Sequence, residues 1–324
     1  MLSCSFHRGQ SRLLRFLQFF FFLNITFLHL GCNINETKRN WRIINANKTS
    51  HLYGIHFFDK KHGWAVGSNS LILKTDDGGL TWGTISQPNA LFSGPINKVY
   101  FSTKNHGWVI GLQGKILYTT NGGRSWVKQN SNLQSGLLDL FFTSESEGWI
   151  VGGNGKILHT TNGGGQWKQQ TGPTAEHLWS VHFVDSNNGW TVGKDGIILH
   201  TNDGGNTWAH QDSGTDQTLL ACHFTKLQRG WVVGVNGLML NTNDGGKNWF
   251  SQTHVTRKTL RDIMFSDSQN GWAVGEDGLI LFTNDGGQNW QVELVKTIEH
   301  LLDVHVSKWI SCIVGAHGTI CIRS

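Results

Sequence analysis

The chain has 324 residues and a formal net charge of +5, and it is unusually rich in glycine (41 residues) and tryptophan (15 residues). Three of its 27 basic residues, Arg8, Arg12 and Arg15, precede an apolar run, and residues 1–31 contain no acid. Without that leader, 24 basic residues stand against 22 acidic ones. So small an excess excludes the strongly basic class of nucleic-acid-binding proteins, and we expect no nucleic-acid partner.

Residues 1–31 are expected to be an export signal. The run from Leu17 to Leu30 is apolar but too short to span a bilayer comfortably. Cys32 follows it, as in bacterial lipoprotein signals, although His29 replaces a small residue there. Three outcomes stay open: lipidation at Cys32, simple secretion, and an uncleaved anchor. Residues 32–40 would be a polar tether, and we expect the protein in the periplasm or anchored to a membrane.

From residue 41 to residue 324 the chain repeats one unit. Its last complete copy, Gly271 to Trp290, reads GWAVGEDGLILFTNDGGQNW. The tryptophans that close the six copies are separated by steps of 44, 41, 41, 41 and 41 residues: Trp82, Trp126, Trp167, Trp208, Trp249 and Trp290. A fixed period near 41 residues indicates a solenoid or a propeller.

Each unit is expected to be β-structure. Residues 271–275 and 278–283 form two short runs rich in aromatic and branched side chains, and Asp277 lies between them with Gly278 in a pair typical of tight hairpins. The next turn, Thr283 to Trp290, has the Asp-box pattern, in which the acid or amide caps turn N–H groups and the tryptophan begins a strand. Six such boxes are expected to be architecture and not catalytic or calcium sites.

The two ends of the repeat complete one another. Residues 41–44 resemble a tryptophan strand without a preceding box, and the C-terminal residues 302–306, 310–315 and 319–322 resemble the first three strands of a unit without the last. We therefore predict an all-β fold: a seven-bladed β-propeller of four-stranded antiparallel blades, closed by the N-terminal strand. The two tryptophan columns are expected to form much of the core between blades.

The innermost strand of each blade contains the positions that vary. Relative to its reference residue (Phe57 in the first blade, Val306 in the last), the preceding column holds His56, Tyr100, Phe141, His182, His223, Met264 and His305. Because these histidines share a column with Phe and Met, we expect packed histidines and no metal or other cofactor.

Two further columns of the innermost strand vary more freely, four and three positions before the reference residue. Their members are Tyr53-Gly54, Asn97-Lys98, Leu138-Asp139, Trp179-Ser180, Leu220-Ala221, Arg261-Asp262 and Leu302-Asp303. The start of an innermost strand lies near the mouth of the central channel. The predicted partner-binding rim is therefore Tyr53, Lys98, Asp139, Trp179, Arg261, Asp262 and Asp303, with an ordinary solvated rim as the alternative.

The sequence offers little for catalysis. It lacks the arginine cluster and the Tyr/Glu pair of a sialidase, and Asp262 with Asp303 is the only carboxylate pair in adjacent blades that a glycosidase could use. We expect no catalytic residue and no enzymatic activity. Cys312 and Cys321 lie in paired strands but diagonally, so buried free thiols are preferred over a disulfide in an oxidising compartment.

In its repeat form, GWAVG followed by G-x-I-L-x-T-x-D-G-G-x-x-W and preceded by L-x-x-I-x-F, the chain from about Trp41 to Ser324 resembles the photosystem II stability/assembly factor family. The resemblance implies a seven-bladed, exported propeller, often a lipoprotein, that binds proteins during photosystem II assembly. Photosynthetic members use a patch of arginines for binding, to which this sequence matches Arg261 alone. The expected function is a monomeric, non-enzymatic scaffold or assembly factor for a protein partner, with a membrane protein complex as the candidate. The alternative is a carbohydrate-binding or glycan-cleaving, sialidase-like propeller.

Overall fold

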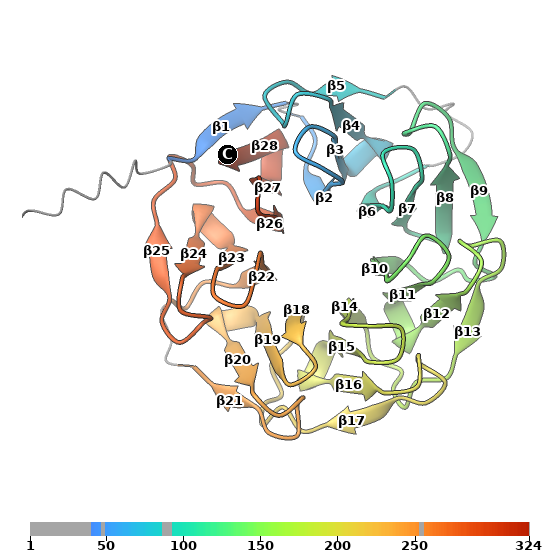
Figure 1. Ribbon diagram of the computed structural model, residues 1–324, viewed down its shortest axis with the longest axis vertical. Coiled ribbons are helices and arrows are strands. Elements are labelled where there is room, and N and C mark those ends of the chain that lie inside the picture. The colour runs from blue at the N-terminus through green and yellow to red at the C-terminus, as the bar shows by residue number, and fades with distance from the viewer. Residues whose placement is uncertain (1–39, 47–48, 86–92, 253–255, 324) are drawn as a thin grey trace, which may run out of the picture. The chain divides into compact units, whose positions relative to one another are not determined.

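The computed structural model describes residues 40–46, 49–85, 93–252 and 256–323. Seven four-stranded antiparallel sheets are arranged as blades around a central channel (Figure 1). The predicted export signal, the lipidation site Cys32 and most of the tether lie outside the described residues. Within the described residues, no helix is long and apolar enough to cross a membrane.

Strands at the same radial position have nearly the same length in every blade. The innermost strands are β2 (Leu52–Phe57), β6 (Ile96–Phe101), β10 (Leu137–Phe142), β14 (Leu178–Phe183), β18 (Leu219–Lys226), β22 (Leu260–Phe265) and β26 (Leu301–Val306). The second strands are β3 (Gly63–Gly67), β7 (Gly107–Gly111), β11 (Gly148–Gly152), β15 (Gly189–Gly193), β19 (Arg229–Gly234), β23 (Gly271–Gly275) and β27 (Ser311–Gly315). The third strands are β4 (Ile72–Thr75), β8 (Lys115–Thr119), β12 (Ile157–Thr160), β16 (Ile198–Thr201), β20 (Met239–Thr242), β24 (Ile280–Thr283) and β28 (Thr319–Arg323). The outer strands are β5 (Gly83–Thr84), β9 (Val127–Asn130), β13 (Lys168–Gln170), β17 (Ala209–Gln211), β21 (Phe250–Ser251), β25 (Gln291–Glu293) and β1 (Arg42–Asn45).

The seventh blade is closed by the first strand, as predicted. Its strand order is β1-β28-β27-β26, and Arg42 to Asn45 pair antiparallel with Ile322 to Thr319. Every third strand therefore has a partner on both sides within its sheet. The closure removes the free sheet edge that would otherwise remain at the C-terminal blade.

The predicted tight turns connect the second and third strands. Six of the seven contain a 3₁₀ turn: η1 (Ser68–Ser70), η2 (Gly153–Gly155), η3 (Lys194–Gly196), η4 (Val235–Gly237), η5 (Glu276–Gly278) and η6 (Ala316–Gly318). Asn154 has φ 58° and Gly155 has φ 63°, and a Cβ at Gly155 would lie 2.0 Å from the carbonyl oxygen of Thr174. Glycine is therefore required at this turn both for its conformation and for the lack of space.

The Asp-box turns have the capping role expected of them. In the first box, the Asp77 carboxylate accepts hydrogen bonds from the Thr81 N–H at 3.0 Å and from the Thr75 hydroxyl at 2.8 Å. The Thr75 hydroxyl oxygen in turn accepts the Gly79 N–H at 2.8 Å. The box thus stabilises its turn with hydrogen bonds within the chain.

The hydrophobic core consists of seven clusters, one at each contact between neighbouring blades. The repeated contact is aromatic: Trp149 of the third blade stacks on Phe183 of the fourth with ring centroids 3.7 Å apart, and Trp208 meets the same ring edge-on at 6.0 Å. Five of the six Gly-Trp residues stack in this way on the phenylalanine of the next blade. The tryptophan columns are therefore inter-blade core, as predicted.

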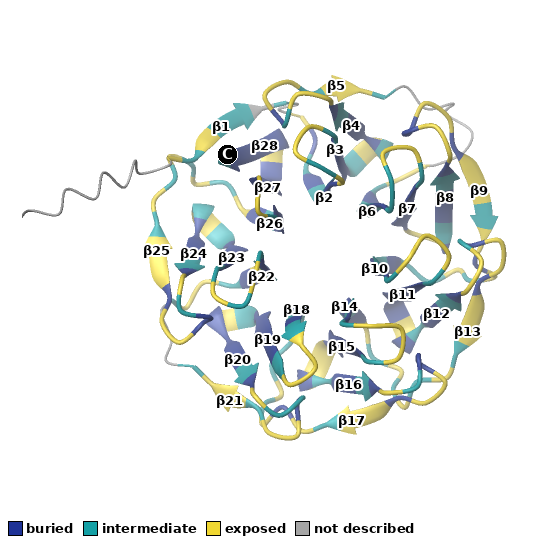
Figure 2. Ribbon diagram, in the orientation of Figure 1, coloured by how far each residue is buried: buried dark blue, intermediate teal, exposed yellow. Residues whose placement is uncertain are grey.

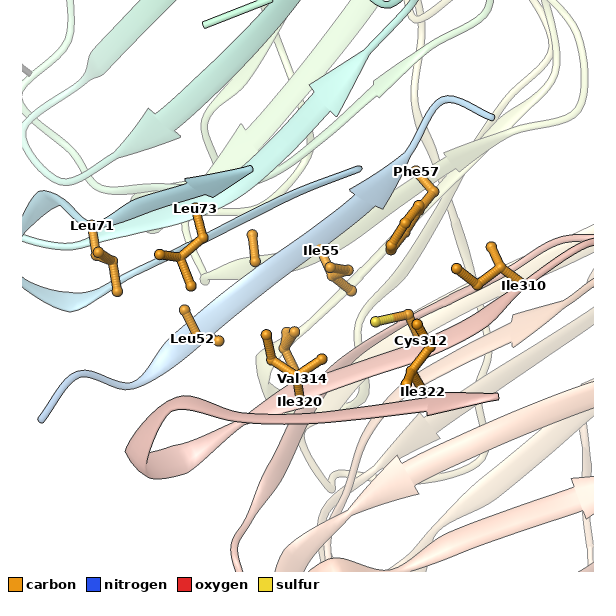
Figure 3. Close-up of a cluster of buried hydrophobic side chains, with 11 residues drawn as sticks. Leu52, Ile55, Phe57, Leu71, Leu73, Ile310, Cys312, Val314, Ile320 and Ile322 are labelled. Atoms are coloured by element: carbon orange, nitrogen blue, oxygen red, sulfur yellow. The ribbon is translucent and has the colours of Figure 1, made fainter. Parts of the chain in front are cut away.

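The contact between the last and first blades is aliphatic instead. Cys312 stands where the other blades have tryptophan, and it packs with Val314, Ile320 and Ile322 against Leu52 and Phe57 (Figure 3). The second strands are the most completely buried, the innermost strands have partly exposed positions facing the channel, and the outer strands are the most exposed (Figure 2).

Candidate functional site

The channel contains two chambers, and the one at its mouth is built from the two variable columns. This mouth chamber has a volume of about 340 Å³. Its lining includes all seven residues predicted for the partner-binding rim: Tyr53, Lys98, Asp139, Trp179, Arg261, Asp262 and Asp303. These residues come from six different blades, and the closed ring brings them together.

The upper wall of the mouth chamber is aromatic and apolar with one exposed cation. Tyr53, Trp179 and Arg261 lie there with Leu138, Leu220 and Leu302 between them. The Trp179 indole N–H is buried and has no hydrogen-bond acceptor. The Arg261 guanidinium is held by Glu276 of η5 at 3.1 Å, an exposed ion pair of the kind that contributes little to folding stability.

Lys98 and three aspartates form the floor of the mouth chamber. The Lys98 ammonium lies 2.7 Å from the nearer carboxylate oxygen of Asp303 and 3.6 Å from that of Asp139. Burial disfavours the charge on Lys98, but Asp139, Asp303 and Asp262 outweigh it and raise the pKa of Lys98 well above its ordinary value. Lys98 therefore stays charged and is paired with the aspartates of the floor.

The aspartates of the floor also join neighbouring blades. Asp303 accepts the Ile55 N–H at 2.6 Å, Asp139 accepts the Val181 N–H at 2.9 Å, and Asp262 accepts the Val304 N–H at 2.9 Å. Each of these bonds crosses from one blade to the next. The four charged side chains of the floor thus have a structural role in addition to any contact with a ligand.

Burial controls the protonation of two of these carboxyl groups. Burial raises the pKa of Asp139, and Lys98 only partly opposes that rise. Burial and the adjacent Asp303 raise the pKa of Asp262 well above its ordinary value. Asp262 and Asp303 each accept a backbone N–H of the next blade, so the carboxylate pair considered for a glycosidase serves the contacts between blades.

The second chamber lies beneath this floor, has a volume of about 140 Å³ and contains the four histidines of the innermost column. His56 and His305 have ring centroids 5.1 Å apart, and His182 and His223 have centroids 4.5 Å apart. Burial lowers the pKa of His56 and of His223 to about 4. Neutral imidazoles therefore fill this histidine chamber at neutral pH.

The histidines of this column are packed side chains, as predicted, and their rings face the channel. The Nε2–H of His56 donates to the Phe101 carbonyl oxygen at 3.0 Å, and Phe141 packs on His182 with centroids 4.7 Å apart. Among the described residues, no three His, Cys, Asp or Glu side chains are arranged to hold a metal ion.

Sequence reasoning missed two features of the channel. The repeat pattern predicts Lys98 and the aspartates as rim residues and does not indicate that they form a floor between two chambers. The pattern also did not identify Glu276 as the partner of Arg261. The sequence does contain a signal for Glu276, because the position after the last glycine of the second strand varies as the rim columns do. Its members are Ser68, Leu112, Gly153, Lys194, Val235, Glu276 and Ala316.

The cysteines of the propeller are free and buried. Cys312 packs in the core between the seventh and first blades, whereas Cys321 packs in the core between the sixth and seventh. Cys321 pairs with Ile313, the neighbour of Cys312, so the two thiols project from opposite faces of the blade. The preference for free thiols over a disulfide is confirmed.

The fold and site define a class: a closed seven-bladed Asp-box propeller whose repeated wall surrounds a variable channel mouth. The chain matches the family described as "Photosynthesis system II assembly factor YCF48" over residues 33–131, 126–212, 206–297 and 252–309. It therefore belongs to that family, in agreement with the resemblance found in the sequence.

Two solved structures show the same fold. One, described as "YCF48 bound to D1 peptide", has a TM-score of 0.75 and 23% identity, with 87% of this chain and 94% of that chain covered. The other, "YCF48 from Cyanidioschyzon merolae", has a TM-score of 0.73 and 22% identity, with 88% of this chain and 98% of that chain covered.

Sequence similarity to curated relatives is confined to short segments. The "Photosystem II assembly lipoprotein Ycf48" of Prochlorococcus marinus (strain NATL2A) is 34% identical over 56 residues, 16% of this chain and 17% of that protein. The "Photosystem II assembly protein Ycf48" of Thermosynechococcus vestitus (strain NIES-2133 / IAM M-273 / BP-1) is 40% identical over 42 residues, 13% of this chain and 12% of that protein. The matched segments thus span less than a fifth of these curated relatives.

Proposed function

We propose that this chain is an exported, non-enzymatic assembly factor that binds a segment of a membrane protein at the mouth chamber. The observation that carries the proposal is the contrast within one strand. The innermost strand repeats its core positions from blade to blade, while the two columns at its start vary. Only the third and seventh blades share the same pair, Leu-Asp, and the two columns together line a chamber of about 340 Å³. A purely architectural ring would not require this variation.

The chemistry of the mouth chamber suits a peptide. Aromatic side chains and arginine are the residue types that most often dominate protein interfaces, and Tyr53, Trp179 and Arg261 provide them. The leucines between these residues offer apolar contacts, and the floor limits how deeply a side chain can enter.

The comparisons support a partner of this kind. A structural neighbour is described as bound to a D1 peptide, and curated relatives are named photosystem II assembly lipoproteins. By analogy we propose a D1-like segment as the partner, with the chain outside the cytoplasm, held at a membrane by its N-terminus and acting as a monomer. The lipoprotein names also favour lipidation at Cys32 over simple secretion or an uncleaved anchor.

The test is binding of a D1 peptide to the purified chain, measured by fluorescence anisotropy. Trp179→Ala with Arg261→Ala should raise the Kd at least tenfold, because both anchors of the mouth chamber are removed. A matched control, Phe250→Ala with Lys128→Ala, changes an aromatic residue and a cation that are exposed on outer strands, and should leave the Kd unchanged.

Two results would contradict the proposal. Equal affinity of both double variants would place binding elsewhere on the propeller. Absence of peptide binding, together with glycan binding that the Trp179→Ala and Arg261→Ala changes abolish, would instead support the carbohydrate-binding alternative.

A further inference from the structure

The face of the propeller opposite the mouth chamber carries a separate cluster of exposed side chains. Innermost strands begin at the mouth and end at this opposite face, where short hairpins lead into the second strands; we call it the hairpin face. Three consecutive blades, the seventh, first and second, present basic and aromatic residues on these hairpins: Phe58, Lys60, Lys61, Lys104, Lys308 and Trp309. We call these six residues the hairpin patch.

The two aromatic residues of the hairpin patch are exposed to solvent, unlike the aromatic residues of the core. Phe58 is 40% exposed and Trp309 is 47% exposed, and the Lys308 ammonium lies 4.3 Å from the centroid of the Trp309 ring. Lysine beside tryptophan is the combination found where proteins meet the polar surface of a bilayer, because the ring has an apolar body and the cation attracts anionic headgroups. The lysines of all three hairpins are exposed.

The carboxylates nearest the hairpin patch are already engaged. Asp59 accepts the N–H groups of Lys61 and His62 at 2.7 and 2.8 Å and lies 2.8 Å from the His62 ring nitrogen. Asp76, in the first Asp-box, pairs with the Lys74 ammonium at 3.0 Å. None of the ion pairs found among the described residues involves Lys60, Lys61, Lys104 or Lys308 with a carboxylate.

The corresponding hairpins of the other four blades are mostly acidic. Those of the third, fourth and sixth blades carry Glu145 with Glu147, Asp185 and Asp267, and no basic residue, whereas the fifth carries Lys226 and Arg229. The Arg229 guanidinium donates to the Gly286 carbonyl oxygen at 2.6 Å, so Lys226 is the exposed cation of that hairpin. The hairpin patch thus gathers four of the five exposed hairpin lysines on three consecutive blades, and an anionic surface would bind that side more strongly.

The chain enters the propeller at this same face and in the same blade as Trp309. Arg42 pairs with Ile322, and Ser311 pairs with Arg323, so β1 begins at the hairpin end of the seventh blade. The preceding Trp41 is held there, because its indole N–H donates to Glu293 at 2.9 Å and Glu293 lies 2.6 Å from Arg323. The first described residues of the propeller, Asn40 and Trp41, therefore lie at the hairpin end of the seventh blade.

The place where the chain enters the propeller is important because the predicted tether before it is short. Residues 33–40 can span at most about 28 Å when fully extended. An anchor in residues 1–32 would therefore keep the start of β1, which lies on the hairpin face, within about 28 Å of the membrane.

We propose that the hairpin patch docks on an anionic membrane surface and holds the mouth chamber facing away from the bilayer. This orientation uses the membrane tether of the proposed function but no feature of the mouth chamber. It would leave the mouth free to bind a protein segment while the propeller lies on the membrane.

The test uses the full chain on phosphatidylcholine vesicles with or without phosphatidylglycerol, containing brominated lipid that quenches nearby tryptophan. On anionic vesicles, Trp309→Phe should remove at least half of the quenching seen for the unchanged chain. Lys60→Glu with Lys61→Glu and Lys308→Glu should also halve the quenching, as should omission of phosphatidylglycerol or addition of 0.5 M salt, which leaves a screening length of about 4 Å.

A charge-matched control separates this docking from attraction by net charge. Lys128→Glu with Lys168→Glu and Arg257→Glu makes the same change at exposed positions away from the hairpin patch and should leave quenching as in the unchanged chain. All substituted residues are exposed, and near-ultraviolet circular dichroism checks the fold of each variant.

Other outcomes would overturn the docking proposal. They are equal quenching in the two triple variants, quenching that Trp309→Phe does not alter, and quenching independent of phosphatidylglycerol. D1 peptide affinity, measured in solution, should be the same for the hairpin-patch variant as for the unchanged chain. Failure of peptide binding would therefore count against the proposed function alone.

Discussion

The wall between blades and the floor of the mouth chamber both join one blade to the next, but they do so by opposite means. In the wall, Trp149 and Phe183 are buried and stacked, and equivalent pairs occur around most of the ring. In the floor, Lys98 with Asp139 and Asp303 makes a charged contact that occurs once. Repetition allows the wall to be stable without polar groups, while the floor places a particular set of charges at one point of the channel.

The difference teaches where this propeller can change without losing its fold. Burial of aromatic area contributes to stability in proportion to area and needs no exact partner. Buried charges are stabilised only while each is paired, so their loss has a large cost that depends on pH. The side chains of the upper mouth chamber have neither constraint, so they can vary without loss of the fold.

The largest expected effect comes from opening the wall. Phe183→Ala should lower the free energy of unfolding by about 3–5 kcal/mol, because a ring that is 2% exposed is replaced by a cavity between two tryptophans. Urea unfolding measured by tryptophan fluorescence checks this value. The matched change Phe250→Ala, at a position that is 57% exposed, should stay within about 0.5 kcal/mol. Similar losses for the two variants would contradict the account of the core.

A loss of about 3 kcal/mol is expected on removing the cation of the floor. Lys98→Met leaves the buried carboxyl groups of Asp139 and Asp303 without their cation. The pKa of Asp139 and that of Asp262 are already raised by burial, so these groups take up protons as the pH falls, and the loss should be smaller at pH 5 than at pH 7.

The control for this experiment is Lys128→Met, which changes an exposed lysine of β9 and should have no measurable effect. Adding Asp303→Asn to Lys98→Met should recover part of the lost stability at pH 7. A loss that does not vary with pH would show that the floor is held by packing and not by charge.

The histidine chamber should make the propeller less stable in acid. The folded pKa of His56 and of His223 is about 4, below the ordinary value near 6.5, so the unfolded chain binds these protons first. Their full contribution is present above pH 6.5 and is lost as the pH falls toward 4, by about 2 kcal/mol for each histidine at pH 5. Asp139 and Asp262 act in the opposite direction, which is why variants must be compared with the unchanged chain.

Replacing His56 and His223 by phenylalanine, the residue found at Phe141 of the same column, should flatten the decrease in stability between pH 6.5 and pH 5. Urea unfolding at several pH values measures the slope. His210→Phe, at an exposed position of β17, should keep the slope of the unchanged chain. If the double variant also keeps that slope, the histidine chamber does not control acid stability.

The smallest expected effects are at the upper mouth chamber. Trp179→Ala should cost about 1 kcal/mol, because the side chain is only partly buried, and Arg261→Ala about 0.5 kcal/mol, because its pair with Glu276 is exposed. Thermal unfolding checks both. A loss near that of Phe183→Ala would make these residues part of the wall and remove the contrast on which the proposed binding role depends.

Part of the channel mouth could be predicted from the sequence repeat. Aligning the copies shows that the positions of Tyr53, Trp179 and Arg261 vary, while the reference residue is phenylalanine in six of the seven blades. A closed ring of inner strands brings the variable positions together. The alignment does not give the depth of each side chain. The assignment of Lys98 to the floor, and the proximity of Asp262 to Asp303, depend on how far each strand reaches into the channel.

The sequence by itself determined the number of blades and the closure of the ring. A period near 41 residues and two complementary ends leave one arrangement that pairs every strand, because each unpaired edge would leave backbone N–H and C=O groups unsatisfied. Only the tertiary structure decided which charges meet in the channel, and which face carries both the hairpin patch and the start of β1. Those contacts join residues far apart in the chain, and their distances follow from the packing of seven blades rather than from local pattern.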